Sequence, residues 1–464
     1  MATGTRARNG RTPERRAQGA RGDRGRSSSR EPRGARGTRA PQGGRGSGGS
    51  RGPAPAPAKT TLRPLSRTSR VGPLQLRQLA LVEIALGIAA VGAVLGGLWL
   101  IPAVAVACVL VLLAFIRRRG QAVQDWMATA LALRARKRIA GPAPAETDPS
   151  IAPVVEGVPE LRPHPYVDKN RRTVGMLGDG TFLTAVVRVE ASGAALRPAF
   201  GARSLPLTLL GGALEVDDIV LESVQLVQQV RSAPAPHLPQ QSVARLSYAP
   251  LQERTGAPAL RMTWVAVKLN PELCREAVEA RGGGVQGAQR CLVRVADHIA
   301  SRVAGAGFQA VVLDQQELNS TLATAVCASP RLAVRASRPD ATPLQRTAET
   351  ARVWRCDDRW HTTYAVGRWP ELGRGAAPLP KVVSLLTAAP AYATTFSVTV
   401  RRGERQGALS LAGHVRVTGG SDTELIGVRR TLEQHARTAK VGLVRLDREQ
   451  LPGAFATLPL GGAR

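Results

Sequence analysis

The longest apolar stretch of the chain runs from Leu79 to Ile116, and its only charged residue is Glu83. Crossing a bilayer takes roughly 20 apolar residues, and this stretch is about twice that long. Two glycines at Gly96-Gly97 interrupt it beside Trp99, and such residues favour a turn at a membrane surface. The pattern predicts a transmembrane hairpin within segment 74–119, with helices at about 79–97 and 100–116.

Arginine residues flank this stretch on both sides, and Arg117, Arg118 and Arg119 follow it directly. A single crossing would carry one basic flank across the membrane, against the positive-inside bias, whereas a hairpin keeps both flanks in the cytoplasm. We therefore expect both termini to be cytoplasmic. We expect five residues at the membrane interface, namely Trp99, Arg117, Arg118, Arg119 and Trp126. The alternative is a buried helical hairpin of a soluble protein.

Two shorter patterns refine this picture. Within the first helix, Gly92 and Gly96 have the small-residue spacing that lets helices approach closely. After the hairpin, segment 120–140 places apolar residues on one helical face and basic residues in its last turn. The predicted apolar face consists of Val123, Trp126, Met127, Ala130 and Leu131. This pattern predicts a helix on the inner membrane surface, or one that docks on another subunit.

The remaining chain divides by composition. Residues 1–73 are rich in Arg, Gly, Ser and Pro, which predicts a disordered basic tail. Residues 141–163 are rich in proline and predict a linker, and residues 164–464 predict a mixed α/β cytosolic domain. Strand–helix–strand alternation at 260–313 and 408–446 indicates layered helices and strands. The sequence itself shows no convincing internal repeat.

The formal net charge of the chain is +30, and the basic residues concentrate around the apolar stretch. This arrangement suits anionic lipid headgroups. The basic tail lacks aromatic residues that could stack on bases, so we do not expect nucleic acid as a partner. The five cysteines contain no C-x-x-C pair, which favours reduced thiols in a cytoplasmic domain.

Motifs that carry chemistry are missing from the sequence. No lysine follows a glycine, so the chain has no phosphate-binding P-loop. Gly282–Gly287 fits the pattern G-x-G-x-x-G, but a predicted helix precedes it where a dinucleotide site needs a strand. We therefore expect a loop between helices there. No histidine has metal-ligand spacing, and we predict no catalytic, cofactor-binding or metal-ligating residue, no cofactor and no small-molecule substrate.

From about Leu74 onward the chain resembles the EccE family, a membrane component of actinobacterial type VII (ESX) secretion systems, and streptomycete members in particular. The resemblance rests on several segments spread along the chain: AFIRRRG, LALRAR, LGDGTFLTAVV, HLPQQSV, YAPLQ, LNPELC, EARGGG, CLVRVADHIASR, WRCDDRWHTTY, GHVRVTG and LVRLDREQLPGAFATLPLG.

The resemblance implies a non-enzymatic structural subunit at the cell membrane, with two transmembrane helices and a cytosolic domain. It implies EccB, EccC and EccD as partners, with the cytosolic domain contacting EccD, and a role in assembling and stabilising a protein-export translocon. Two alternatives follow from the residues alone. One is a membrane-anchored enzyme with an unrecognised α/β active site. The other is a membrane-tethered nucleic-acid binder that uses the basic tail.

Overall fold

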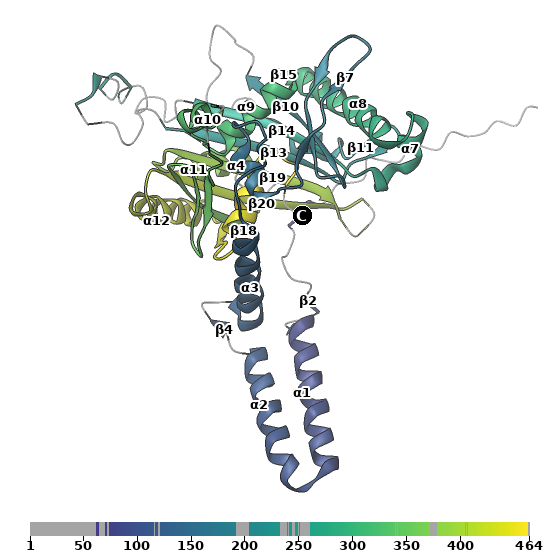
Figure 1. Cartoon of the computed structure of the whole chain (residues 1–464), viewed down its shortest axis with the longest axis vertical. Coiled ribbons are helices and arrows are strands. Elements are labelled where there is room, and N and C mark those ends of the chain that lie inside the picture. The colour runs from purple at the N-terminus through teal and green to yellow at the C-terminus, as the bar shows by residue number, and fades with distance from the viewer. Residues whose placement is uncertain are drawn as a thin grey trace, which may run out of the picture. The chain divides into compact units, whose positions relative to one another are not determined.

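We analysed a computed structural model of the chain (Figure 1). It describes residues 62–64, 70–71, 74–115, 117–118, 121–191, 204–232, 260–338, 342–371, 378–403 and 407–462, and isolated residues between these ranges (239, 241–243, 246–248, 250, 340 and 405). The predicted disordered tail therefore lies almost wholly outside the described residues. So do three of the seven residues of the HLPQQSV segment and three of the five residues of the YAPLQ segment.

Two antiparallel helices, α1 (Leu76–Leu95) and α2 (Leu100–Phe115), occupy the apolar stretch, joined by the short 3-10 turn η1 (Gly97–Trp99) (Figure 1). Helix α1 ends earlier than we predicted, because Gly96 and Gly97 adopt positive φ angles of 59° and 62°. These angles leave the helical region and are accessible to glycine at little cost. The two strands β4 (Arg117–Arg118) and β5 (Gln121–Ala122) then form a tight turn that leads into α3 (Val123–Ile139).

Helix α3 buries a different face from the predicted one. Met127 and Leu131 are exposed, whereas Leu133 is buried. One turn further, Arg136 forms an ion pair with the nearly buried Glu349 at 2.9 Å and donates a hydrogen bond to the carbonyl oxygen of Arg448 at 2.6 Å. Arg136 and Leu133 thus lie on the side of α3 that contacts the folded domain. The periodicity of apolar residues does not reveal a polar contact of this kind. The C-terminal part of α3 is thus attached to the folded domain.

A 13-stranded sheet forms the centre of this domain. Its strands run in the order β16-β17-β18-β20-β19-β13-β14-β10-β9-β6, and every neighbouring pair along this path is antiparallel. Strand β15 adds to β10, β21 adds to β18, and β1 (Leu62–Pro64) adds in parallel to the start of β20. The prediction of a mixed α/β domain is therefore confirmed, with an antiparallel sheet.

The domain consists of two halves with the same order of elements, apart from one additional helix, α7, in the first half. The first half comprises α4 (Ala152–Gly157), β6 (Arg162–Pro163), β9 (Met176–Gly178), β10 (Leu183–Ala191), α5 (Leu207–Gly211), β13 (Ser223–Arg231), β14 (Leu260–Leu269), α7 (Arg275–Ala280), α8 (Gly284–Gly305), β15 (Phe308–Val312) and α9 (Gln315–Ala325). The second comprises α10 (Pro330–Ala336), β16 (Thr347–Glu349), β17 (Trp354–Cys356), β18 (Arg359–Arg368), α11 (Leu379–Thr387), β19 (Ala393–Arg402), β20 (Leu409–Gly419), α12 (Asp422–Thr438), β21 (Gly442–Arg445) and α13 (Gln450–Phe455).

Short pairs complete the list of strands. These are β2 (Arg70–Val71) with β3 (Leu74–Gln75), β7 (Tyr166–Val167) with β8 (Thr173–Val174), and β11 (Glu215–Val216) with β12 (Ile219–Val220). A 3-10 turn, η2 (Pro271–Cys274), precedes α7.

The two halves meet at the central pair β13 and β19, where Val227 lies opposite Ser397. The same hydrogen bond recurs in each half. Leu313, which follows β15, donates its N–H to the carbonyl of Val186 at 3.0 Å, and Leu446, which follows β21, donates to Thr363 at 3.1 Å. The domain is therefore duplicated in topology, although the sequence shows no convincing repeat. Strand order and register cannot be deduced from the identities of the residues.

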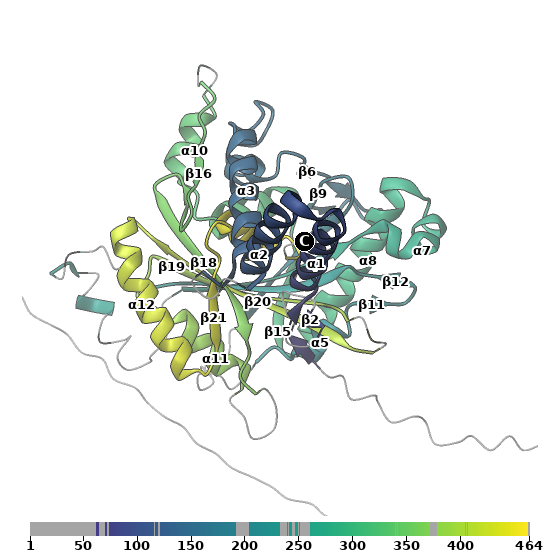
Figure 2. The same ribbon diagram turned by 90° about the horizontal axis from the view of Figure 1, so that it is seen from below.

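Helices cover both faces of the sheet. One hydrophobic core joins the sheet to α5, α7, α8, α11 and α12, and the second core joins its opposite face to α4, α9 and α13. Figure 2 shows α8 and α12 toward opposite ends of the sheet, as the duplication requires. We call the face with the second core the α9/α13 face.

The predicted linker 141–163 differs from expectation. It contains α4, and Ile151, Val154 and Val155 are buried in the second core. The buried carboxylate of Glu156 accepts hydrogen bonds from the backbone of Arg346 and Thr347. Prolines at the ends of the segment suggested a spacer, but its few apolar residues complete the core of a distant part of the chain.

Candidate functional site

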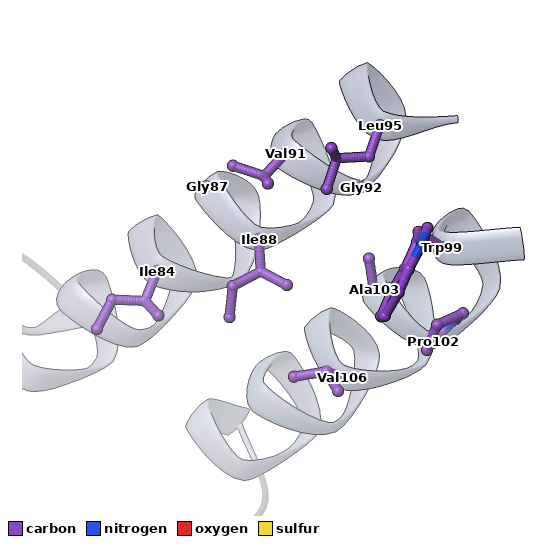
Figure 3. Close-up of a pocket in the computed structure, with 10 residues that line it drawn as sticks. All are labelled: Ile84, Gly87, Ile88, Val91, Gly92, Leu95, Trp99, Pro102, Ala103 and Val106. Atoms are coloured by element: carbon purple, nitrogen blue, oxygen red, sulfur yellow. The ribbon is translucent and has the colours of Figure 1, made fainter. Parts of the chain in front are cut away.

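The helical hairpin contains an apolar groove of about 490 Å³ between α1 and α2 (Figure 3). Side chains from both helices and the turn line it: Ile84, Gly87, Ile88, Val91, Gly92, Leu95, Trp99, Pro102, Ala103 and Val106. No charged residue is among them. This groove can hold only apolar groups, such as hydrocarbon or apolar side chains.

Two glycines have different roles in this groove. A Cβ atom on Gly92 would lie 2.3 Å from the Cβ atom of Ala103, so a glycine here permits the close approach of α1 and α2. A Cβ atom on Gly87 would meet no atom within 4 Å, so this position leaves open space. Of the predicted small-residue pair, Gly92 lies at the helix contact and Gly96 lies in the turn.

The outward faces of the hairpin are also apolar. Val94 is 88 % exposed, Ile101 is 75 % exposed and Leu86 is 67 % exposed. Exposed apolar surface over a whole element marks a surface that another apolar phase or partner covers. Among the residues that the structure describes, no helix has both the length and the apolar composition needed to cross a membrane.

The predicted interface residues occupy the two ends of the hairpin. Trp99 lies in the turn η1, at the end where α1 passes into α2. Arg117 and Arg118 lie in β4, beyond the 16 residues of α2, which rise about 24 Å. Trp126 lies in the first turn of α3, close behind them in sequence, and Arg119 lies outside the described residues. The hairpin thus separates Trp99 from Arg117, Arg118 and Trp126.

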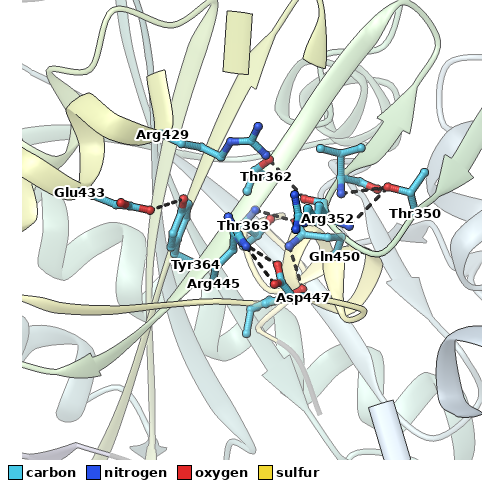
Figure 4. Close-up of polar contacts among 12 residues, drawn as sticks. Thr350, Arg352, Thr362, Thr363, Tyr364, Arg429, Glu433, Arg445, Asp447 and Gln450 are labelled. Carbon is cyan, nitrogen blue, oxygen red and sulfur yellow. Dashed lines mark hydrogen bonds and ion pairs between the residues drawn. The ribbon is translucent and has the colours of Figure 1, made fainter. Parts of the chain in front are cut away.

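A polar network in the second half is a candidate for chemistry (Figure 4). The hydroxyl of Tyr364 donates to Glu433 at 3.1 Å, and Arg445 forms a two-point ion pair with Asp447 at 2.6 and 3.0 Å. The side chain of Gln450 accepts the N–H of Thr363 at 2.8 Å. Burial and the Glu433 carboxylate raise the pKa of Tyr364, which therefore stays protonated at neutral pH. The network joins β18, β21, α12 and α13 and is suited to holding them together.

The buried thiols are also poor candidates for catalysis. Burial raises the pKa of Cys291 to about 11 and the pKa of Cys356 well above the ordinary thiol value, so both stay protonated at neutral pH. Within the described ranges, no three His, Cys, Asp or Glu side chains gather so as to hold a metal ion.

Only the start of the glycine-rich segment Gly282–Gly287 lies in the expected loop: Gly282 and Gly283 connect α7 to α8, and the residues from Gly284 onward belong to α8. Gly282, Gly283 and Gly284 have positive φ angles, which turn the chain sharply. Gly287 lies in α8, where a Cβ atom would be 2.3 Å from the carbonyl oxygen of Val278. Tight packing of α8 against α7 explains this last glycine.

Arg136 and most of the residues lining the groove are functional candidates that were not identified from the sequence, whereas Trp99 was predicted at the membrane interface. The spacing at Gly92 pointed to close helix packing, yet it could not show where open space remains. Arg136 stood among four basic residues in one helical turn, and only the position of Glu349 distinguishes it from the others.

Comparison with known proteins places the chain near one family. Residues 257–366 match the family described as "Putative type VII ESX secretion system translocon, EccE". The chain is also 29 % identical over 223 residues to the ESX-1 secretion system protein EccE1 of two Mycobacterium tuberculosis strains, CDC 1551 and H37Rv. These matches cover 45 % of this chain and 42 % of each relative, so the aligned part spans less than half of the relatives' length. The family match runs from β14 into β18 and thus includes parts of both halves.

Proposed function

We propose, on the premise that this chain belongs to the EccE family, that it is a structural subunit of a type VII secretion membrane complex. The family match carries this proposal. Its role would be to support assembly and stability of the export machine, without an enzymatic reaction of its own. The protonated buried thiols and the structural role of the Tyr364 network support a non-enzymatic subunit.

We place the hairpin in the cell membrane, with both termini and the large domain on the cytoplasmic side. Its apolar residues are exposed on the outward faces, where lipid would remove them from water. Helix α2 rises about 24 Å, less than the roughly 30 Å of hydrocarbon. Long arginine side chains at one end and an exposed tryptophan at the other are the residues that accommodate such a mismatch.

The contact between α3 and the domain gives this arrangement a mechanical role. The ion pair between Arg136 and Glu349 joins the helix that follows the hairpin to the edge strand β16. The hairpin would thereby hold the sheet domain near the inner membrane surface, where it can contact other subunits. We expect EccB, EccC and EccD as these subunits, with EccD contacting the domain.

Purification of a tagged full-length chain in a mild detergent tests the proposal. We expect EccB, EccC and EccD to be recovered with it, and recovery of the chain alone would contradict the assignment. A matched pair of variants tests whether the close contact between α1 and α2 is needed for assembly. Gly92→Ala places a methyl group against Ala103 and should reduce recovery of the partners, whereas Gly87→Ala fills open space and should not.

Reporter fusions test the topology separately. A reporter that is active only outside the cytoplasm should be silent when fused to the C-terminus. The same reporter fused after Trp99, with the rest of the chain removed, should be active. Activity at the C-terminus would refute the hairpin arrangement without affecting the family assignment.

A further inference from the structure

A polar pocket of about 330 Å³ lies on the second half of the domain, where three chain segments meet. These are the loop between α9 and α10, the turn between β17 and β18, and the residue before β19. The pocket is lined by Cys327, Ala328, Ser329, Pro330, Arg331, Asp358, Arg359 and Tyr392. Its volume is at the lower end of the range for small-molecule sites.

Positive charge collects around this pocket. Arg331 and Arg359 line it, and the guanidinium of Arg359 lies 3.9 Å from the centre of the Tyr392 ring. Arg231 approaches the same ring at 5.6 Å. Tyr392 thus holds two guanidinium groups beside one cavity, by the attraction of a cation to an aromatic face.

A further guanidinium, that of Arg416, lies behind the pocket wall and is fully buried. One of its nitrogens donates to the carbonyl of Ala325 and to Thr395, but its Nε and Nη1 atoms meet no hydrogen-bond acceptor among the described residues. Cys327, in the wall, is near enough to Arg416 to interact with it electrostatically. A buried cation without a carboxylate partner is costly, so its retention here calls for an explanation.

The nearby carboxylates do not balance these charges. Asp357 is already engaged by both arms of Arg346, at 2.8 and 2.7 Å, and by the N–H of Ser329. Asp358 lines the pocket and is 3.4 Å from Arg359, so it offsets one positive charge. Arg231, Arg331 and Arg416 are then left without a carboxylate ion pair in the described part of the domain. The pocket therefore has an excess of positive charge.

His361 is another titratable group near Arg416 and Arg359. Its ring is fully buried against Trp354, with ring centres 5.0 Å apart. Burial lowers the pKa of His361 well below its ordinary value, and the positive charges of Arg416 and Arg359 lower it further. The histidine therefore stays neutral and does not add to the charge.

We propose that this pocket binds a phosphate group, carried by a small soluble molecule or by a lipid headgroup. Arg359 and Arg331 line the cavity from two sides and can each donate to phosphate oxygens, which suits the planar guanidinium. The buried charge of Arg416 strengthens the attraction without touching the ligand. An anion in the pocket would offset the charge that the protein leaves unbalanced.

The test uses the full-length chain in detergent, so that the basic residues of its N-terminal part are the same in every sample. Arg331→Gln and Arg359→Gln remove one charge each from the pocket. Arg335→Gln is the matched control, because Arg335 lies on the same helix α10, is exposed and does not line the pocket. Binding of inorganic phosphate and of glycerol 3-phosphate is measured by phosphorus NMR, and binding to vesicles with and without phosphatidic acid by flotation.

We expect Arg359→Gln to weaken binding by about tenfold or more, as the loss of a charge-assisted hydrogen bond predicts. Arg331→Gln should have the same direction of effect, and it leaves the fold intact because its side chain is exposed. Arg335→Gln should bind like the wild type. An Arg359-dependent effect with soluble phosphates identifies a soluble ligand, and one with vesicles alone identifies a lipid. If the three variants weaken binding equally, or none does in either assay, the proposal is wrong.

Discussion

In the first half of the sheet, Val186 on β10 lies opposite Ala266 on β14, whereas in the second half Thr363 on β18 lies opposite Arg416 on β20. These pairs occupy the same place, because Leu313 and Leu446 donate equivalent hydrogen bonds to Val186 and Thr363. Two residues earlier, Thr184 in the first half corresponds to His361 in the second. The two halves thus share a backbone but differ in polarity on the α9/α13 face.

This difference shows that the fold itself does not require the buried arginine, Arg416. The first half builds the same strands and the same hydrogen bonds around an alanine. A buried charged group that one half contains and its equivalent lacks is a candidate for function, because buried charge without a partner costs stability. Four measurements test the differences between the two halves.

The largest effect is expected for Ala266→Arg, which gives the first half the residue of the second. Ala266 is fully buried in the second core, and no pocket lining of arginine and tyrosine surrounds it. The variant should lose about 3–5 kcal/mol or fail to fold. Urea unfolding of the detergent-purified chain, followed by tryptophan fluorescence, measures this. Ala266→Met controls for size, and equal losses in both variants would show that the charge is irrelevant.

Gly453→Val should cost about 1–3 kcal/mol through overpacking. A Cβ atom on Gly453 would lie 2.6 Å from Leu446 and 3.0 Å from Thr363. Its counterpart is Ser320, which also stands seven residues after the equivalent leucine but is exposed. Ser320→Val should therefore change the unfolding midpoint little. A similar loss at both positions would contradict the structural difference between α13 and α9.

Lowering the pH should destabilise the second half through His361. Its folded-state pKa is depressed below 6.5, so the unfolded chain binds the proton first and stability falls as the pH drops below 6.5. The loss is about 1.4 kcal/mol at pH 5.5 if the folded histidine remains neutral. His361→Gln should remove this part of the pH dependence, whereas Thr184, its counterpart, does not titrate. An identical pH profile for the variant and the wild type would be inconsistent with a buried neutral histidine.

The smallest change in stability is expected for Arg416→Met. Replacing a buried charge by an apolar side chain of similar length is often close to neutral in stability. The carbonyl of Ala325 would keep the hydrogen bond that Gln229 donates at 3.4 Å. The urea midpoint should stay constant or rise while phosphate binding weakens. A loss of more than about 1 kcal/mol would assign Arg416 a structural role instead.

The elements of this protein follow closely from its sequence. Strand β14 and helix α12 lie within the predicted strand–helix–strand segments 260–313 and 408–446, because the pattern of apolar positions and the capping residue Ser421 are local signals. The two helices of the hairpin follow from composition, and their turn follows from adjacent glycines. Local patterns also indicated the loop between two helices at Gly282–Gly287, although only Gly282 and Gly283 lie in it.

Tertiary structure alone decided the rest. Strand order made the two halves equivalent, although their residues differ, and long-range pairing brought Arg359, Tyr392 and Cys327 to one pocket. Of the basic residues near the end of α3, Arg136 forms the ion pair with Glu349. Part of the predicted proline-rich linker forms α4, because its apolar residues pack in the second core. Sequence periodicity specifies which side of an element is apolar, but contacts between distant residues depend on register and chain path. The apolar hairpin could therefore be predicted from the sequence, whereas the charged pocket could not.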